Sequence, residues 1–481
     1  MENPKEKGLG TLRLTMFGIG LILASGAFAI PGDFAAAGAY PLASLIGWGI
    51  TGVGMLSLCL CYFRLSIVKP QLTSGLYTYA REGFGEFIGF CSAWGYWISA
   101  ILAQISFLTM LFSSLGHFFP GAFGAGNNLT SIVTASVIVW VLAFLISRGI
   151  NQAVTINVIV VLAKLLPILV LLVAIIFAGA FDPDVFMANF TGEGSGMTLM
   201  EQVKGTTFIT VWIFIGIEGA VVISQRAKTT KDAGRATVIC FLCMLALYMM
   251  ISVLSMGVLP TEELAELSTP SMAGVLAAVV GSWGATLVNV AVIISVAGAL
   301  FTYTILCVDS AYAPASKGCF PKFFARVNER GTPVTSLLLS TVVIQIFLII
   351  IYFNDSTYQI CYSLSTSMIM FPYFLSGLYC LKITFKGETL EGLSGGAKAG
   401  TWLIAIIGAV YGAWMLYASG WQAVLSSAVL FGPGILLYAY TQRQKAEKIF
   451  PKVVDAAAVV VVVIAFVLSI VFMANGTIQM F

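Results

Sequence analysis

Two long apolar segments are interrupted near their middle, the first by Ala24-Ser25-Gly26-Ala27 and the second by Phe214-Ile215-Gly216-Ile217-Glu218-Gly219-Ala220. Small residues at this depth indicate either close packing of two helices or a helix that is broken inside the membrane. The interruptions lie in the first and the sixth apolar segment, at corresponding positions of two halves of the chain. Such a pair favours the broken-helix interpretation and predicts a transport site at the midplane of the bilayer.

The composition places most of the 481 residues in lipid. Asp, Glu, Lys and Arg make up 9% of the chain, whereas 59% is apolar and the mean hydropathy is +0.98. A soluble domain carries about 25% of charged residues. The apolar runs are continuous rather than alternating, which excludes a transmembrane β-barrel. The sequence therefore predicts an all-α polytopic membrane protein.

Thirteen apolar runs are long enough to span a membrane, which takes about 20 residues. The predicted spans are Leu12–Ala36, Leu42–Leu65, Gly85–Phe118, Leu129–Ile146, Ala153–Phe177, Thr206–Ser224, Ala236–Val258, Ala285–Ala311, Ser336–Tyr352, Tyr358–Lys382, Trp402–Tyr417, Ala423–Tyr440 and Val453–Met473. The first span carries Pro31 and Asp33 at its end and is too long for the apolar region of a signal peptide. The last span is expected to be peripheral to a body of twelve helices.

The basic residues predict the orientation. With the N-terminus in the cytoplasm, every Lys and Arg except Lys164 and Lys204 lies on the cytoplasmic side, as the positive-inside rule requires. We therefore expect a multi-pass protein of the inner (cytoplasmic) membrane. Because topology accounts for the basic residues, the net charge of +3 does not indicate nucleic-acid binding.

The reactive side chains argue against catalysis and against a metal site. The chain has one His and nine Cys. Cys240 and Cys243 have a CxxC spacing, but they lie on an apolar helix without a second pair and are expected to pack rather than to bind metal. A channel would need a continuous polar face on several spans, which the sequence lacks. We expect no enzyme activity, no cofactor and no metal.

Broken helices can hold both ends of an amino acid with backbone groups. At the first break, freed N–H groups at a helix N-terminus can bind a carboxylate. These are the N–H groups of Ser25, Gly26 and Ala27. At the second break, freed carbonyls can accept hydrogen bonds from an ammonium group. These are the carbonyls of Trp212, Ile213 and Ile215.

Two ionisable residues are predicted at membrane depth, where a charge needs a partner or a task. Glu218 follows the second interruption, and it either caps unwound backbone as a neutral acid or couples protonation to transport. Lys164 lies in the middle of the fifth span, and it is either paired for structure or able to titrate.

Several short motifs jointly resemble the amino acid–polyamine–organocation (APC) superfamily of transporters. They are Ser25-Gly26-Ala27-Phe28 with Pro31, Ser74-Gly75-Leu76-Tyr77-Thr78-Tyr79-Ala80-Arg81, Phe214 to Ala220, Lys317-Gly318-Cys319-Phe320-Pro321 and Gly331-Thr332-Pro333-Val334. Within the superfamily, Gly216 to Val222 followed by Arg226-Ala227-Lys228 is similar to the arginine/ornithine antiporters of the basic amino acid/polyamine branch. The resemblance covers roughly residues 10 to 445.

The resemblance implies an inverted repeat of five plus five helices, with helices one and six broken. Its expected parts are a transport core over 1–384 with repeats at about 12–177 and 206–382, helices eleven and twelve with a basic cytoplasmic segment over 385–452, and an extra helix over 453–481. It implies exchange of a basic amino acid, arginine or lysine, for ornithine or a related amine. The alternative is a proton-coupled amino acid symporter that carries lysine, histidine, tyrosine or an amine. A homodimer is compatible with either.

The resemblance also assigns roles to side chains. Trp212 and Tyr303 match aromatic walls that stack on the substrate side chain. Tyr96 and Gln104 lie eight residues apart on one helical face, as candidates for a gate and for binding the distal polar group. Leu21 stands where arginine/agmatine exchangers carry Asn, and Tyr303 where they carry Trp, so the selectivity stays open.

Two coupling roles and two weaker site candidates complete the list. Glu218 matches a residue that links conformational change or protonation to the site. Lys164 matches a lysine that supplies the charge of the sodium ion found in sodium-coupled relatives, so no sodium requirement is expected. Thr366 and Ser367 on the tenth span are weaker candidates for substrate binding.

Overall fold

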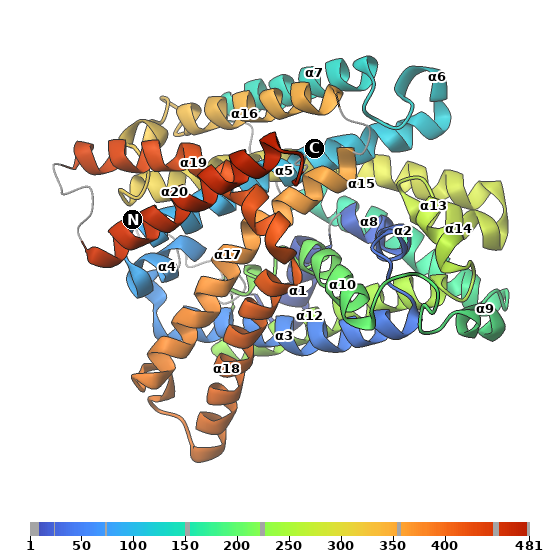
Figure 1. Ribbon diagram of the computed structural model, residues 1–481, viewed down its shortest axis with the longest axis horizontal. Coiled ribbons are helices and arrows are strands. Elements are labelled where there is room, and N and C mark those ends of the chain that lie inside the picture. The colour runs from blue at the N-terminus through green and yellow to red at the C-terminus, as the bar shows by residue number, and fades with distance from the viewer. Residues whose placement is uncertain are drawn as a thin grey trace.

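The computed structural model describes residues 9–23, 25–72, 75–149, 154–221, 227–353, 357–445 and 452–478, with only the backbone of 154–163 and 357. Helices account for nearly all of this part of the chain (Figure 1). In order, the longer helices are α1 (Thr11–Ile22), α2 (Ile30–Ala36), α3 (Pro41–Val68), α4 (Leu76–Phe84), α5 (Glu86–Phe118), α7 (Leu129–Ser147), α8 (Val154–Phe177), α10 (Leu199–Ile213), α12 (Thr230–Ser255), α14 (Ser271–Val280), α15 (Ser282–Ser316), α16 (Val334–Tyr352), α17 (Thr357–Phe385), α18 (Gly395–Ala418), α19 (Gly420–Gln444) and α20 (Val453–Ala474). The predicted all-α class is confirmed.

Short helices connect the long ones. They are α6 (Pro120–Phe123), α9 (Pro183–Ala188), α13 (Thr261–Glu266) and the 3₁₀ helices η1 (Ser25–Phe28), η2 (Pro70–Leu72), η3 (Lys322–Ala325) and η4 (Glu388–Leu390). In Figure 1, α7 and α16 lie side by side along the upper edge, and α18 packs on α17 in a hairpin at the lower edge.

Ten of the described helices are long and apolar enough to cross a membrane. They coincide with the predicted second, third, fourth and seventh to thirteenth spans. The first span is divided into α1, η1 and α2, the fifth corresponds to α8, and the sixth begins as α10. Each predicted span thus has a helical counterpart, and the chain is a multi-pass membrane protein.

Some predicted boundaries were wrong. Helices α10 and α18 each begin seven residues before the predicted Thr206 and Trp402. The early start of α10 is set by a capping box, in which Thr198 and Glu201 exchange hydrogen bonds at the helix N-terminus. An apolar window misses such a start because the first turns are polar. Helix α14 was not predicted, since its ten residues are too few for a span.

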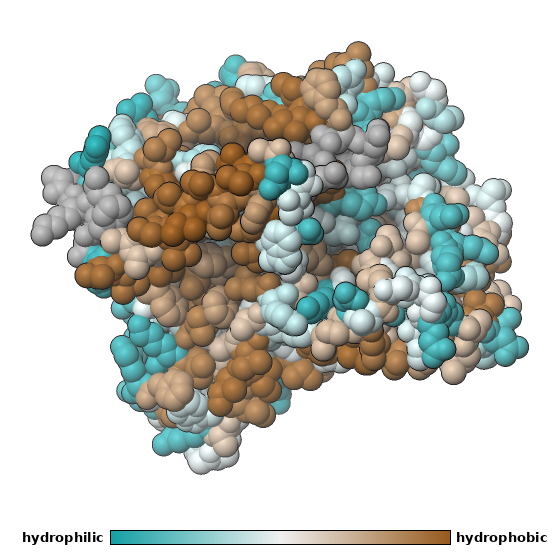
Figure 2. All heavy atoms as spheres, in the orientation of Figure 1, coloured by the Kyte–Doolittle hydropathy of each residue, from teal (hydrophilic) through white to brown (hydrophobic). Residues whose placement is uncertain are grey.

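Burial separates central from peripheral helices. In α5, 89% of the most apolar stretch is buried, whereas in α20 only 11% is. Figure 2 shows hydrophobic side chains gathered over α20 and its neighbour α19, where Val461, Ile464 and Val467 are exposed. Exposed aliphatic side chains along a whole helix are expected where lipid covers them. The predicted peripheral position of the last helix agrees with this pattern.

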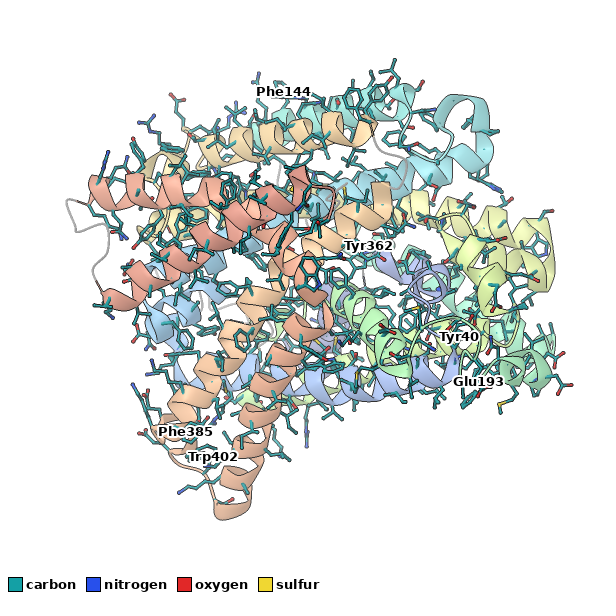
Figure 3. The ribbon with its side chains drawn as sticks, viewed as in Figure 1. Tyr40, Phe144, Glu193, Tyr362, Phe385 and Trp402 are labelled. Carbon is teal, nitrogen blue, oxygen red and sulfur yellow. The ribbon has the colours of Figure 1, made fainter. Side chains whose placement is uncertain are left out.

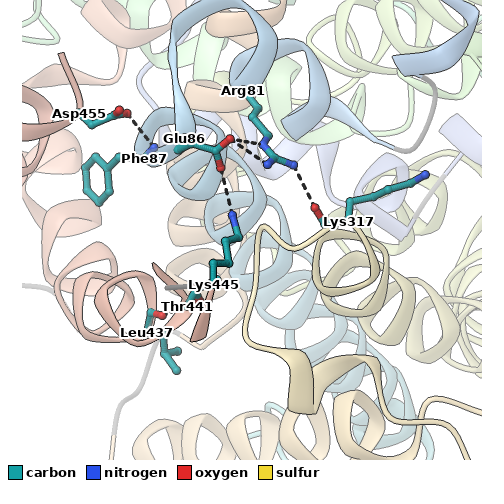
Figure 4. Close-up of polar contacts among 8 residues, drawn as sticks. All are labelled: Arg81, Glu86, Phe87, Lys317, Leu437, Thr441, Lys445 and Asp455. Carbon is teal, nitrogen blue, oxygen red and sulfur yellow. Dashed lines mark hydrogen bonds and ion pairs between the residues drawn. The ribbon is translucent and has the colours of Figure 1, made fainter. Parts of the chain in front are cut away.

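The N-terminus of α5 is held by the last helix and by an ion-pair network (Figure 4). The buried Asp455, at the start of α20, accepts a hydrogen bond from the backbone N–H of Phe87 at 2.9 Å. Glu86 pairs with Arg81 at 2.8 Å and with Lys445 at 3.5 Å. A carboxylate at a helix N-terminus satisfies a free N–H group and complements the helix dipole. Helix α20 therefore supplies a cap that α5 lacks in its own sequence.

We expect Asp455→Ala to lower the free energy of unfolding by about 1–2 kcal/mol, because the Phe87 N–H would stay buried without an acceptor. Asp455→Asn keeps an acceptor oxygen and should lose less. Thermal melting of both variants in detergent checks this order. Equal melting temperatures of Asp455→Ala and the wild type would contradict the proposed cap.

Candidate functional site

The first span is broken as predicted. Helix α1 ends at Ile22, and α2 begins at Ile30 after the 3₁₀ turn η1. The carbonyl of Ile22 accepts a hydrogen bond from the Tyr248 hydroxyl at 3.2 Å, and that of Leu23 accepts one from the Lys164 ammonium at 2.7 Å. Side chains from α12 and α8 therefore satisfy carbonyls that a continuous helix would have paired internally.

The second break begins where α10 ends, at Ile213, and turns follow from Phe214 to Glu218. Gly216 has φ +114°, a conformation that side chains other than glycine rarely adopt. A Cβ atom at Gly216 would lie 2.7 Å from the carbonyl oxygen of Leu21 in α1. The two breaks thus touch through bare backbone, and glycine is required for that approach.

The backbone groups expected to hold an amino acid lie at these breaks. Ser25, Gly26 and Ala27 form the buried first part of η1, where the leading N–H groups of a helix have no acceptor within it. The hydroxyl of Ser25 is buried and has no hydrogen-bond partner in the part of the chain that the structure describes. At the second break, the Trp212 carbonyl already accepts from the N–H of Ile215 at 3.2 Å. One of the three predicted carbonyls is therefore engaged by the turn.

Aromatic side chains form a cluster next to the first break. The members of this aromatic cluster are Phe107, Trp212, Tyr303, Tyr358 and Tyr362. Trp212 stacks on Tyr362 with 5.8 Å between the ring centroids, and its indole N–H donates to the Tyr358 hydroxyl at 3.3 Å. Tyr303 packs edge-on against Phe107, with 4.5 Å between the ring centroids. Tyr362 lies toward the middle of the bundle in Figure 3.

Gly26 lets this cluster reach the broken backbone. A Cβ atom at Gly26 would lie 2.6 Å from Nε1 of Trp212, closer than two such atoms can approach. The absence of a side chain at Gly26 therefore places the indole directly on η1. Trp212 and Tyr303, both predicted as aromatic walls, are brought together through Phe107.

Glu218 is held by tyrosines from two other helices. Its carboxylate accepts hydrogen bonds from Tyr96 of α5 at 2.9 Å and from Tyr373 of α17 at 2.5 Å. It also accepts one from the N–H of Gly216 at 3.0 Å. Glu218 thus ties the second break to α5 and α17 and caps the N–H of Gly216, while its role in coupling stays a prediction.

Gln104 lines neither of the two cavities described below. Its side chain is fully buried, donates to Thr304 at 2.7 Å and accepts from the Cys307 thiol at 3.3 Å. Both polar ends are therefore used to join α5 to α15, and its role in binding substrate stays a prediction. The hydroxyls of Thr366 and Ser367 bond to carbonyls of their own helix.

Two cavities lie on opposite sides of the aromatic cluster. We name the cavities by the orientation expected from the sequence. The inner cavity, of about 240 Å³, is lined by residues of α4, α5 and α15 and by Glu218 and Val221. The outer cavity is lined by the other end of α5, by α14 and by Tyr358. On α5, Phe107 stands between Tyr96 of the inner cavity and Thr109 of the outer cavity. The cluster therefore separates the two cavities along this helix.

The inner cavity carries two carboxylates, Glu218 and Asp309, and none of its described lining residues is Lys or Arg. Asp309 was not predicted, although it is a charge near the end of the apolar run of the eighth span. Tyr358, Tyr362 and Tyr373 were not predicted either, since tyrosines in a bundle are more often packing residues than ligands.

Two interrupted helices that meet inside a membrane bundle are typical of secondary transporters. The family model described as amino acid permease matches residues 9–429. The arginine/ornithine antiporter of Pseudomonas aeruginosa is 41% identical over 475 residues, 96% of this chain and 97% of that protein. The chain belongs to the amino acid permease family, and its resemblance to the APC superfamily is confirmed.

Other relatives carry related names. A putative arginine/ornithine antiporter of Escherichia coli (strain K12) is 41% identical over 442 residues, 91% of this chain and 93% of that protein. The L-lysine transport protein of Corynebacterium glutamicum is 36% identical over 476 residues, 96% of this chain and 94% of that protein. These matches run over nearly the whole chain and support amino acid transport as its function.

Gly216→Ala should lower the free energy of unfolding by about 1–3 kcal/mol, because alanine is strained at this φ and its Cβ would push α1 away from the second break. Gly400→Ala is the matched control, since its Cβ would meet no atom within 4 Å and alanine favours a helix. Melting temperatures in detergent provide the comparison. A Gly216→Ala variant as stable as the control would refute the tight contact of the two breaks.

Proposed function

We propose that this protein exchanges a basic amino acid, arginine or lysine, for ornithine or a related amine across the cytoplasmic membrane by alternating access. The observation that carries the proposal is the inner cavity, where Glu218 and Asp309 provide negative charge and no described lining residue provides a positive one. Carboxylates in a site of low dielectric favour cationic substrates and disfavour anionic ones. The names of the relatives, which include arginine/ornithine antiporters and a lysine transport protein, agree with this charge.

The two breaks would bind the ends that all amino acids share. The N–H groups of Ser25, Gly26 and Ala27 would bind the α-carboxylate, helped by the positive end of the η1 and α2 dipoles. The carbonyls of Ile213 and Ile215 would accept from the α-ammonium group. Trp212, which lies on Gly26, would cover the aliphatic part of the substrate.

Glu218 would link substrate binding to the inner gate. Its carboxylate is shared between Tyr96 and Tyr373, so an arriving cation competes with these two hydroxyls for the same oxygens. Loosening the tyrosines would free α5 and α17 to move relative to the second break. The aromatic cluster, with Trp212 bonded to Tyr358, would act as the corresponding barrier on the outer side.

The two breaks also support a division of the chain into a repeated core and added helices. Breaks at corresponding positions support a transport core over 1–384 built from repeats at 12–177 and 206–382. Helices eleven and twelve (385–452) and the extra helix (453–481) would surround it. The distribution of Lys and Arg supports an N-terminus in the cytoplasm. A homodimer stays a prediction.

Proton-coupled symport is the second candidate, favoured by one observation. Lys164 is buried, and within the described structure its ammonium group donates a hydrogen bond to the Leu23 carbonyl rather than to a carboxylate. A lysine held in this way can give up its proton at lower cost than one paired with an anion. A symporter of lysine, histidine, tyrosine or an amine would fit this feature.

Counterflow in proteoliposomes distinguishes the two mechanisms. We expect labelled arginine or lysine to enter vesicles that contain internal ornithine, without any proton gradient, and to enter empty vesicles far more slowly. Sodium should make no difference. Uptake that requires an inward proton gradient and no internal amino acid would establish the symporter instead.

Lys164→Ala should slow exchange by about 10- to 100-fold, because the hydrogen bond from its ammonium group to the first break is lost. We expect no sodium dependence to appear in the variant. Lys204→Ala is the control, since Lys204 lies more than two turns before the end of α10 and its ammonium group lies over the ring of Tyr417, 3.9 Å from the centroid. Initial rates of ornithine-driven arginine uptake measure both, and equal rates for the two variants would exclude a role of Lys164.

A further inference from the structure

We propose that Asp33, in the outer half of the broken first helix, binds the distal cationic group of the substrate, the guanidinium of arginine or the side-chain ammonium of lysine and ornithine. This inference rests on the proposed function and deepens it by naming a residue that selects the side chain. It differs from the contacts at the breaks, which serve the α-amino and α-carboxyl groups.

The carboxylate of Asp33 is buried but incompletely satisfied. The side chain is 4% exposed, and its Oδ2 atom has no hydrogen-bond partner among the described residues. None of the ion pairs found among the described residues involves Asp33. A buried carboxylate without a cation is costly, and the cost is recovered when a cationic ligand arrives. The unpaired oxygen therefore marks a place for positive charge.

The backbone around Asp33 does not need the carboxylate as a cap. The N–H of Gly32 donates to the hydroxyl of Ser271 at 2.9 Å, and the N–H of Asp33 itself donates to the carbonyl of Ala29 at 2.9 Å. Ser271 in turn donates to Ala29 at 3.0 Å. These bonds fix the start of α2 to α14, so the structural role is filled by Ser271.

Asp33 lies near the outer cavity, which Tyr358 of the aromatic cluster lines. The N–H of its neighbour Gly32 donates to Ser271, and Pro270, next to Ser271, lines this cavity together with Tyr358. Tyr358 lines the outer cavity and holds Trp212, which rests on Gly26. A cation next to Asp33 would therefore meet both a carboxylate and aromatic rings, the combination that binds guanidinium and ammonium groups.

The spacing along the first helix suits an extended basic amino acid. Asp33 follows Gly26 by seven residues, which at a helical rise of 1.5 Å per residue is roughly 10 Å. This is comparable with the distance between the carboxylate and the guanidinium of extended arginine. One end of the substrate would lie on η1 and the other at Asp33, while Glu218 and Asp309 serve the inner side.

Arginine and citrulline provide the test, because citrulline has the same length and shape but a neutral urea in place of the guanidinium. Binding of each to the full chain in detergent is followed by the rise in melting temperature. We expect Asp33→Asn to weaken arginine binding by about 10- to 100-fold and to leave citrulline binding unchanged. Without ligand, the variant should melt no lower than the wild type.

Asp455→Asn is the matched control, because Asp455 is also a buried carboxylate whose Oδ2 has no partner among the described residues, but it lies in the first turn of α20. Its ratio of arginine to citrulline affinity should equal that of the wild type. An unchanged ratio in Asp33→Asn, or an equal loss for both ligands, would overturn the inference while leaving counterflow by the wild type intact. A wild type that shows no exchange of basic amino acids would instead overturn the proposed function.

Discussion

The central constraint on this molecule is that unwound backbone inside a membrane must find hydrogen-bond partners without water. The first break meets this constraint with Lys164 and Tyr248, whose side chains reach the carbonyls of Leu23 and Ile22. The second break meets it with its own turns and with Glu218. Because the first break uses side chains from distant helices, and Glu218 of the second is held by Tyr96 and Tyr373, the breaks and the surrounding bundle depend on one another.

The contact of the two breaks explains the central arrangement of side chains. Gly216 lies on Leu21, and Gly26 lies under Trp212, so each break offers a flat backbone surface to the opposite helix. The aromatic cluster then occupies the outer side, and the tyrosines around Glu218 occupy the inner side. Carboxylates lie on both sides of the aromatic cluster, with Asp33 on the outer side and Glu218 and Asp309 on the inner side. A cation that crosses the protein would meet a carboxylate at both stages.

The helical class, the spans and the positions of both breaks could be predicted because a low-dielectric medium forces apolar composition and helical hydrogen bonding on the sequence. Small residues at Ser25-Gly26 and Gly216 revealed the breaks for the same reason. Which polar groups meet was harder to predict. Gln104 lies on the predicted face of α5 with Tyr96, but its amide bonds to Thr304 and Cys307. Asp309, Tyr358 and Tyr373 join the centre through tertiary packing, which periodicity along one helix does not contain.

The cap that α20 provides for α5 has a consequence for biogenesis. Helix α5 is the most deeply buried of the candidate spans, yet the carboxylate that completes its N-terminus is Asp455, more than 360 residues later in the chain. During synthesis the ribosome therefore releases almost the entire protein before this end of α5 can be closed. The final helix therefore completes the assembly, and a chain that stops before it would leave the N–H of Phe87, at the N-terminal end of the central helix, without this acceptor.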